Sequence, residues 1–540
     1  MADVTISQLT LATPDAGAEI PFTDGNPATT KKTTLNNILR NAGNIGIGKA
    51  PSYLLDVAGD VALNTVRVGL GSGSVSDNVV VGMNAALANN TTGFMNVAVG
   101  SQAMRNNLDG SVNVAVGNQA LRSNTTGSRQ VAVGCNALDA NLTGYFNTAV
   151  GYKAMSNNTL GWQSVAVGHE AMSLNTTGTQ NTALGYNALR GNLTGNTNVS
   201  IGYLCLENSN SDSNVAIGAF AMQNNITGSQ NSALGYYSMN SHRRGNQNTA
   251  FGYNTLNSSL TANYSVAVGC FALTNHATSD ANVSIGYQSL NDAGKVTTAG
   301  SFVTGVTYTI VSLGTTDFTA CGATAGSSVG NTFVATNAGA GTGTASPNSN
   351  QSVAIGFQSC YKITTGNRNT AVGFQTLWSN LTGTNNTAIG YSAGFGSLGT
   401  NNIFLGNGSS SNSNTDNNTI NLGNGSITNL RCAVQTIQAL SDERDKTDIK
   451  DIPVGLKFIN DLKPRSFLWN TRDKSKVNIH EYGFVAQELL NTENIHNTKV
   501  PYLVNDSNPD RLEASYSVLI PILVKAIQEL SEKVKRLESK

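Results

Sequence analysis

Residues 147–185 read NTAVGYKAMSNNTLGWQSVAVGHEAMSLNTTGTQNTALG, and this stretch decides the fold. It contains three blocks of the form N-T-A-V-G, which end at Gly151, Gly168 and Gly185, 17 residues apart. The same block recurs along most of the chain, and the spacing is 17 with a rare 16 or 18. It ends at 18 glycines: Gly82, Gly100, Gly117, Gly134, Gly151, Gly168, Gly185, Gly202, Gly218, Gly235, Gly252, Gly269, Gly286, Gly356, Gly373, Gly390, Gly406 and Gly423.

Each copy predicts a short strand followed by a bend, an apolar segment and a turn. The residue before the glycine is apolar in all 18 copies, and a β-branched residue stands two positions earlier in all copies except that of Ser232. A small residue, usually Ala, stands between them, so the strand has one face of larger side chains and one of small ones. The small face suggests close approach of another chain or sheet. Asn and Thr-Gly, as in Asn124 to Gly127, then provide turn chemistry.

A unit of 17 residues is too small to bury a core alone, but stacked units bury one together. We therefore predict a mainly β protein whose middle is an elongated β-solenoid. At about 4.8 Å per rung, 18 rungs give a rod on the order of 85 Å long. The period is too short for ankyrin or tetratricopeptide repeats, and the β-branched strands exclude an all-helical array.

The composition divides the chain near residue 440. Only 12% of the 540 residues are charged and 56 are Gly, but half of the charged residues fall within 441–540. The formal net charge of +0 argues against a nucleic-acid partner. The six cysteines are scattered without metal-like spacing, so we expect buried thiols of a reducing cytoplasm and neither metal nor cofactor. No secretory signal and no apolar run of membrane-spanning length are present, so no membrane insertion is expected.

The repeat closely resembles the N-S-V-A-I-G repeats of trimeric autotransporter adhesin heads and similar repeats of bacteriophage tail fibres, although the period here is longer than in the adhesin heads. In those families three chains form a parallel trimeric β-roll. The resemblance therefore implies a homotrimer.

The sequence is divided into six parts. Residues 1–45 are interpreted as the N-terminal attachment segment, with a disordered leader as the alternative. Residues 46–77 are interpreted as a fibre-shaft motif, because NIGIGKAPSYLLDVAG (44–59) resembles a motif near the start of phage fibre shafts. The repeat occupies 78–295 and resumes over 346–440. Residues 296–345 interrupt it with alternating β-branched and aromatic residues and Gly/Thr turns, which predicts a small β module for receptor contact or a structural collar.

The last hundred residues, 441–540, are expected to form a small α+β domain. Its closing segment has apolar residues at a 4-3-4-4-3 spacing, which predicts a helix with one apolar stripe, as in a short coiled coil. These residues are Leu519, Leu523, Ala526, Leu530, Val534 and Leu537. Upstream stand SDERDK (441–446), GLKFINDLKPRSFLW (455–469) and YGFVAQEL (482–489).

The order and residues of these motifs resemble those of the C-terminal intramolecular chaperone of the endosialidase type, a self-cleaving peptidase domain of phage tail fibres and tailspikes. Family members trimerise, assist folding of the upstream β-structure and then cut themselves off by a serine-lysine mechanism. The resemblance implies that Ser441 is the nucleophile, that Lys446 is the base and that the cut falls between Leu440 and Ser441.

Four further residues of this segment are assigned supporting roles. Asp442 lies next to the nucleophile, Arg444 would orient the site or bind an acidic partner, and Gln487 and Glu488 match the family's A-Q-E motif. A serine hydroxyl needs a base, and a lysine serves as one only where burial or neighbouring positive charge favours its neutral amine. The alternative for Ser-Asp before charged residues is a helix N-cap.

The resulting expectation is a phage tail fibre, a virion structural protein made in the host cytoplasm. It would join tail or baseplate proteins through its N-terminus and attach to a host-surface glycan or protein receptor. A tailspike-type polysaccharide depolymerase or a trimeric adhesin with the same chaperone are the alternatives.

Glycan cleavage needs two carboxylates about 5 to 9.5 Å apart. Asp139 and Glu207, the nearest match in repeat phase, lie four rungs or roughly 19 Å apart. Beyond self-cleavage, no turnover of an external substrate is expected.

Overall fold

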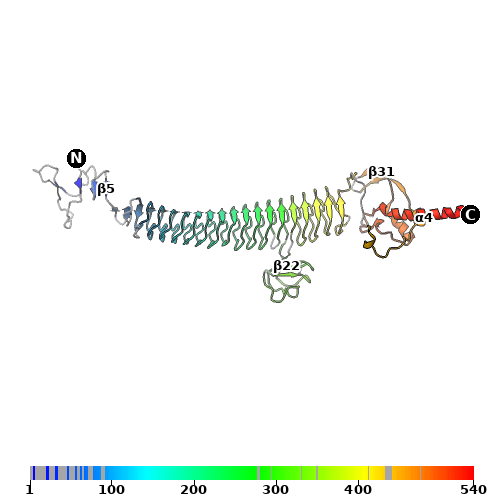
Figure 1. The fold of residues 1–540 in the computed structure, drawn as a ribbon, viewed down its shortest axis with the longest axis horizontal. Coiled ribbons are helices and arrows are strands. Elements are labelled where there is room, and N and C mark those ends of the chain that lie inside the picture. Colours follow the sequence, from blue (N-terminus) through cyan, green and yellow to red (C-terminus); the bar gives the residue numbers. More distant parts are fainter. Residues whose placement is uncertain are drawn as a thin grey trace. The chain divides into compact units, whose positions relative to one another are not determined.

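The chain was examined as a computed structural model (Figure 1). It describes residues 66–70, 77–86, 92–275, 280–293, 295–329, 331–347, 351–411, 413–427, 429–431, 441–472, 474 and 476–540, together with six short strands before residue 64. Two compact units, Met1–Thr278 and Ser279–Lys540, are described separately.

The first strands form small pairs. Strand β1 (Val4–Thr5) and β5 (Leu55–Val57) each pair in parallel with β4 (Ile45–Ile47), and β2 (Ile20–Phe22) pairs antiparallel with β3 (Lys31–Thr33). Strands β6 (Val61–Leu63) and β7 (Val66–Gly69) lead antiparallel into the first repeat strand. The expected fibre-shaft motif thus contributes β4 and β5, and most of the expected attachment segment lies outside the described residues.

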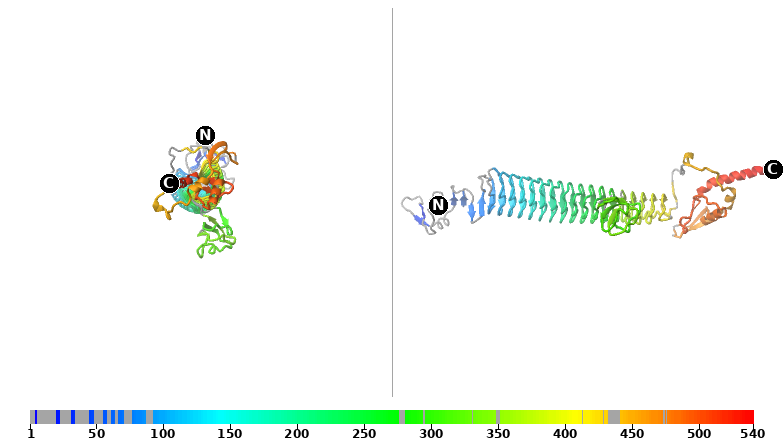
Figure 2. Two further views of the ribbon diagram at one scale, coloured as in Figure 1. Left: turned by 90° about the vertical axis from the view of Figure 1, so that its right-hand side faces the viewer. Right: turned by 90° about the horizontal axis from the view of Figure 1, so that it is seen from below.

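The repeat of the first unit is a parallel β-solenoid, as predicted. Each strand pairs in register with the equivalent strand of the next coil, so that Ala115 faces Ala132 and Ala132 faces Ala149. Figures 1 and 2 show these strands side by side in one ladder. They are β8 (Val79–Gly82), β9 (Val97–Val99), β10 (Val114–Val116), β11 (Val131–Val133), β12 (Thr148–Val150), β13 (Val165–Val167), β14 (Thr182–Leu184), β15 (Val199–Ile201), β16 (Val215–Ile217), β17 (Ser232–Leu234), β18 (Thr249–Phe251) and β19 (Val266–Val268).

The small face of the strand points into the chain's own coil. The central alanines, such as Ala149 and Ala166, are fully buried with a column of Leu and Met side chains that includes Met155 and Met172. Of the two expected neighbours of the alanine face, another chain or another sheet, another chain is not needed, because the face is already buried inside the coil of the single chain. The larger side chains point outward, and Leu184 is 46% exposed.

Two kinds of contact hold neighbouring coils together: hydrogen bonds between buried asparagines and close backbone contacts between glycines. Six buried asparagines form a ladder in which each Nδ2 from Asn124 onward donates to the Oδ1 one coil before: Asn107, Asn124, Asn141, Asn158, Asn175 and Asn192. The strand-ending glycines adopt positive φ and lie against the glycine of the next coil, so a Cβ on Gly185 would collide with the carbonyl oxygen of Gly202. The sequence had indicated these asparagines only as turn residues.

The second unit repeats the same coil. Strand β20 (Val283–Ile285) pairs in register with β25 (Val353–Ile355), followed by β26 (Thr370–Val372), β27 (Thr387–Ile389), β28 (Ile403–Leu405) and β29 (Ile420–Leu422). The 70 residues from Val283 to Val353 therefore leave the register intact, and the interruption is accommodated outside the ladder.

The interruption forms a four-stranded antiparallel sheet in the order β21-β24-β22-β23. Its strands are β21 (Thr297–Thr298), β22 (Thr307–Ser312), β23 (Thr332–Val334) and β24 (Thr344–Pro347). Phe302, Tyr308, Phe318 and Phe333 form its core with tilted and edge-on ring contacts. This short segment thus buries a core of its own.

The C-terminal hundred residues form a small α+β domain. It contains η2 (Glu443–Asp445), α2 (Leu456–Asp461), the hairpin β30 (Arg465–Asn470) and β31 (Val477–Gly483), α3 (Ala486–Ile495), the pair β32 (Val504–Asn505) and β33 (Glu513–Ala514), η3 (Tyr516–Val518) and α4 (Leu519–Glu538). Phe458, Leu489, Leu503 and Ile522 bring α2, α3, the loop before β32 and α4 into one core. The predicted closing helix is confirmed.

Candidate functional site

The structure brings Ser441 and Lys446 into direct contact. Lys446 Nζ lies 2.7 Å from Ser441 Oγ and donates to it, and it also donates to the Ser441 carbonyl oxygen at 3.1 Å. The five-residue separation is bridged by the single 3-10 turn of η2, which returns the chain so that the two side chains meet. Both residues are exposed in the single chain. The contact places an amine within proton-transfer distance of a hydroxyl.

Asp442 builds the turn that makes this contact. Its Oδ1 accepts from the backbone N–H of Arg444 at 2.9 Å, which caps η2. The Arg444 guanidinium also pairs with the Asp442 carboxylate at 2.6 Å, and this hydrogen bond holds the pKa of that carboxyl below its usual range. The capping interpretation of Ser-Asp thus applies to Asp442, while Ser441 remains free to contact Lys446.

The other two assigned residues lie on α3, away from this contact. Glu488 forms an ion pair with Arg465 of β30 at 2.5 Å, which lowers the pKa of Glu488 and joins the hairpin to the helix. Gln487 is exposed, and within the described residues neither side chain forms a hydrogen bond with Ser441 or Lys446. The structure therefore gives Glu488 a scaffolding contact. Leu440, the other side of the expected cut, lies outside the described residues.

The segment that carries these contacts was compared with known families. Residues 441–492 match the family model of the chaperone of endosialidase. The match begins at Ser441 itself and extends through the hairpin into α3. Comparison with curated proteins and with solved structures found no match. The chaperone match and the 17-residue solenoid together fit a phage tail fibre with a C-terminal chaperone.

Helix α4 of this chaperone domain buries only part of the predicted apolar stripe. Leu519 and Ala526 are buried inside the domain together with Ile522, which the stripe had not included. The other stripe residues are exposed: Leu523 is 43% exposed, Leu530 49% and Leu537 70%. One face of the first turns thus belongs to the domain core, and the helix also presents apolar side chains that no described part of the single chain covers.

The carboxylates considered for glycan cleavage have other partners. Asp139 pairs with Arg122 at 2.9 Å, and its burial raises its pKa. Glu207 accepts a hydrogen bond from Gln223 of the next coil. No group of three or more His, Cys, Asp and Glu side chains that could hold a metal occurs in the described part of the chain. Among the same residues no helix is both long and apolar enough to cross a bilayer.

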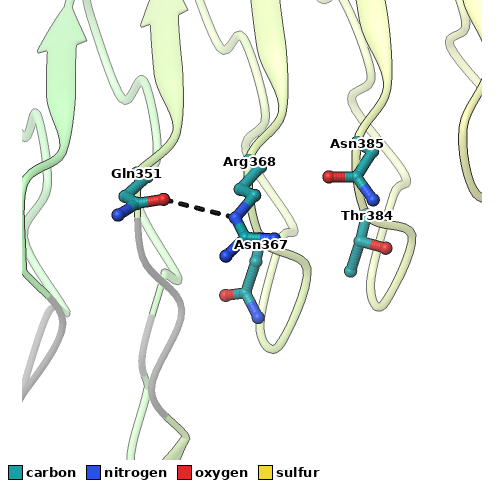
Figure 3. A pocket seen from close by; sticks show the side chains of 5 residues that line it. All are labelled: Gln351, Asn367, Arg368, Thr384 and Asn385. Carbon is teal, nitrogen blue, oxygen red and sulfur yellow. Dashed lines mark hydrogen bonds between the residues drawn. The ribbon is translucent and has the colours of Figure 1, made fainter.

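A polar pocket lies on the solenoid of the second unit, at the turns that precede the strands (Figure 3). It encloses about 250 Å³ and is lined by Gln351, Asn367, Arg368, Thr384 and Asn385. Figure 3 shows Arg368 extended toward Gln351, and its Nε donates to Gln351 Oε1 at 3.3 Å. The sequence analysis had not singled out these residues, because polar turn residues recur in every copy.

Proposed function

We propose that the chain is a phage tail fibre that attaches to the host surface and is assembled as a homotrimer by its C-terminal chaperone domain. The observation that carries the proposal is the chaperone match at the end of a β-solenoid chain. A solenoid with a 17-residue period has many equivalent registers, so three chains that start pairing at random would slip by whole coils. A compact domain that joins the chain ends first would fix that register.

The exposed apolar surfaces support three-chain assembly. The last turns of α4 expose Leu530, Val534 and Leu537, and the solenoid strands expose residues such as Leu184 and Phe251. Apolar side chains that recur along a whole ladder are stabilised by burial against another surface. Copies of the same chain offer matching surfaces with the same 17-residue spacing.

Self-cleavage is proposed to follow from the Ser441–Lys446 contact. A neutral Lys446 amine would take the Ser441 Oγ proton, and Oγ would then attack the carbonyl carbon of Leu440. The Oγ–C bond forms, the C–N bond breaks, and the released amine of Ser441 takes the proton back from Lys446. Water then hydrolyses the ester, which separates residues 1–440 from 441–540.

This chemistry needs a drier site than the single chain provides. Lys446 is exposed, whereas a lysine serves as a base only where burial or neighbouring positive charge favours its neutral amine. Assembly with further copies is the step that we propose covers the dyad. Cleavage would then follow assembly rather than precede it.

The test measures the intact mass and the native size of the full wild-type chain and of the variants Ser441→Ala and Lys446→Met. We expect the wild type to yield fragments 1–440 and 441–540, with a native size of three fibre chains. Both variants should remain whole and still assemble to three times 56.2 kDa. An uncut wild type contradicts the proposed dyad. A native mass equal to that of a single chain contradicts the proposed assembly.

A further inference from the structure

Because the coils share one backbone, a comparison of the same position in different coils identifies side chains that the fold does not require. We define the turn column as the two side chains that precede the buried polar residue before each strand. Several coils carry only small or amide side chains there, such as Ser229 and Gln230, and the second residue of the pair keeps the same positive φ from coil to coil. Two consecutive coils both carry rings there, Tyr145 and Phe146 in one and Trp162 in the next. Because the coils on either side fold without a ring in this column, these rings are not required by the coil.

The three rings form one cluster, in which Tyr145 and Phe146 are exposed and Trp162 is half-buried. Tyr145 stacks on Trp162 with centroids 5.6 Å apart and planes 9° apart, and Phe146 meets Tyr145 edge-on at 5.4 Å. Tyr145 is 42% exposed and Phe146 is 43% exposed. Elsewhere in the described coils of this unit, a turn-column ring stands without a ring on the next coil, as at Phe94 and Tyr264. Exposed rings on consecutive coils leave apolar surface in contact with water, which a ligand can cover.

A positive charge completes the cluster. The Arg129 guanidinium lies over the Phe146 ring, 5.0 Å from its centroid. Within the described residues the Arg129 side chain has no carboxylate partner, and its backbone N–H donates to the Ser111 carbonyl at 2.9 Å. A guanidinium held over a ring keeps its outer N–H groups for a carboxylate ligand.

The other side of the cluster offers a ring face and amides. Tyr145 covers one face of Trp162, and the opposite face is directed toward the next coil, where the shorter Thr179 stands. Gln163 and Gln180 lie beside it and are joined by a 3.4 Å hydrogen bond. An aromatic face bordered by amides and a cation suits a sugar ring, which presents C–H groups to the ring and hydroxyls to its borders.

We propose that this cluster binds an acidic oligosaccharide, with one sugar on Trp162 and a carboxylate at Arg129. The two groups lie two coils apart, about 9.6 Å along the ladder, so the ligand spans more than one sugar unit. The proposal rests on the proposed host attachment and names its site and ligand class.

The test uses the full chain on an array of bacterial oligosaccharides that contains carboxylate-bearing glycans and their carboxyl-reduced counterparts. In the variant Tyr145→Ser/Phe146→Gln/Trp162→Thr, each ring becomes a residue that other coils carry, so the fold is retained. We expect wild-type binding to carboxylate-bearing glycans, and a loss of roughly tenfold or more in this variant. Arg129→Gln should lose roughly tenfold for the acidic glycan only. Arg368→Gln, in the same column of the second unit, is the matched control and should bind like wild type (Figure 3).

Each other outcome overturns the proposal. Full binding by the triple variant places the site elsewhere and leaves host attachment standing. Equal binding of the carboxyl-reduced glycans by the wild type shows that the charge has no role. Loss of glycan binding in Arg368→Gln alone assigns binding to the pocket of Figure 3. A triple variant with altered native mass identifies the cluster as a contact between copies. A wild type that binds bacterial cells but no glycan overturns the ligand class, and one that binds neither contradicts attachment itself.

Discussion

The asparagine ladder permits a sharp test, because Asn157 and Asn158 are neighbours in opposite environments. Asn158 is fully buried, and its Nδ2 donates to Asn141 Oδ1 at 2.9 Å and to the Gly161 carbonyl at 3.0 Å, while its Oδ1 accepts from Asn175 at 2.8 Å. Asn158→Ala removes all three bonds and leaves Asn141 Oδ1 buried without its donor. At about 1 kcal/mol net per bond, the expected loss is about 3 kcal/mol.

Asn157→Ala is the matched control. Asn157 is exposed, and its backbone N–H, which bonds to Ser173, is retained in alanine. We expect a change within about 0.5 kcal/mol for this variant.

The two variants are compared by hydrogen exchange under native conditions and by denaturant unfolding. Because coils contact only their neighbours, protection in Asn158→Ala should fall in the coils between residues 141 and 178 and persist far from them. Equal stability of the two variants, or an equal loss of protection along the whole solenoid, would refute a ladder that stabilises coils pairwise.

Three further predictions follow from single contacts. Burial lowers the pKa of His242 to about 4, so the folded protein loses about 3 kcal/mol of stability as pH falls from about 6.5 toward 4. His242→Asn should abolish this pH dependence in denaturation measured from pH 7 to 4. Gly185→Ala would force a Cβ against the Gly202 carbonyl at a φ of +140°, and a loss of roughly 3 kcal/mol is expected in denaturant; an unchanged midpoint would show that the coils can part there. Glu529 Oε2 accepts from the Leu456 N–H at 2.8 Å, so Glu529→Ala should cost the C-terminal domain about 1 kcal/mol, read from its thermal midpoint, and Glu532→Ala at an exposed position serves as the control.

The sequence predicted the fold class because the evidence for it is local and repeated. A β-branched residue, a small residue and an apolar residue before each glycine specify a strand, and a constant spacing forces equivalent strands into one register. The same reasoning predicted the closing helix from Leu519 onward. The proximity of Ser441 and Lys446 was implied by the family resemblance, and the η2 turn gives it a physical cause.

Only the tertiary structure decided which side of each element is covered. Alternation along a strand shows that two faces differ, but the way the coil closes determined that Ala149 is inside and Leu184 outside. Asn recurs every 17 residues in the position of Asn158 and not in that of Asn157, but the sequence indicated only a turn residue there, and its burial depends on the stacking of neighbouring coils. In α4 the predicted stripe leaves the domain core already at Leu523, because the domain packs against the helix face that carries Leu519 and Ile522. Periodicity thus determines register, whereas burial depends on contacts between segments distant along the chain.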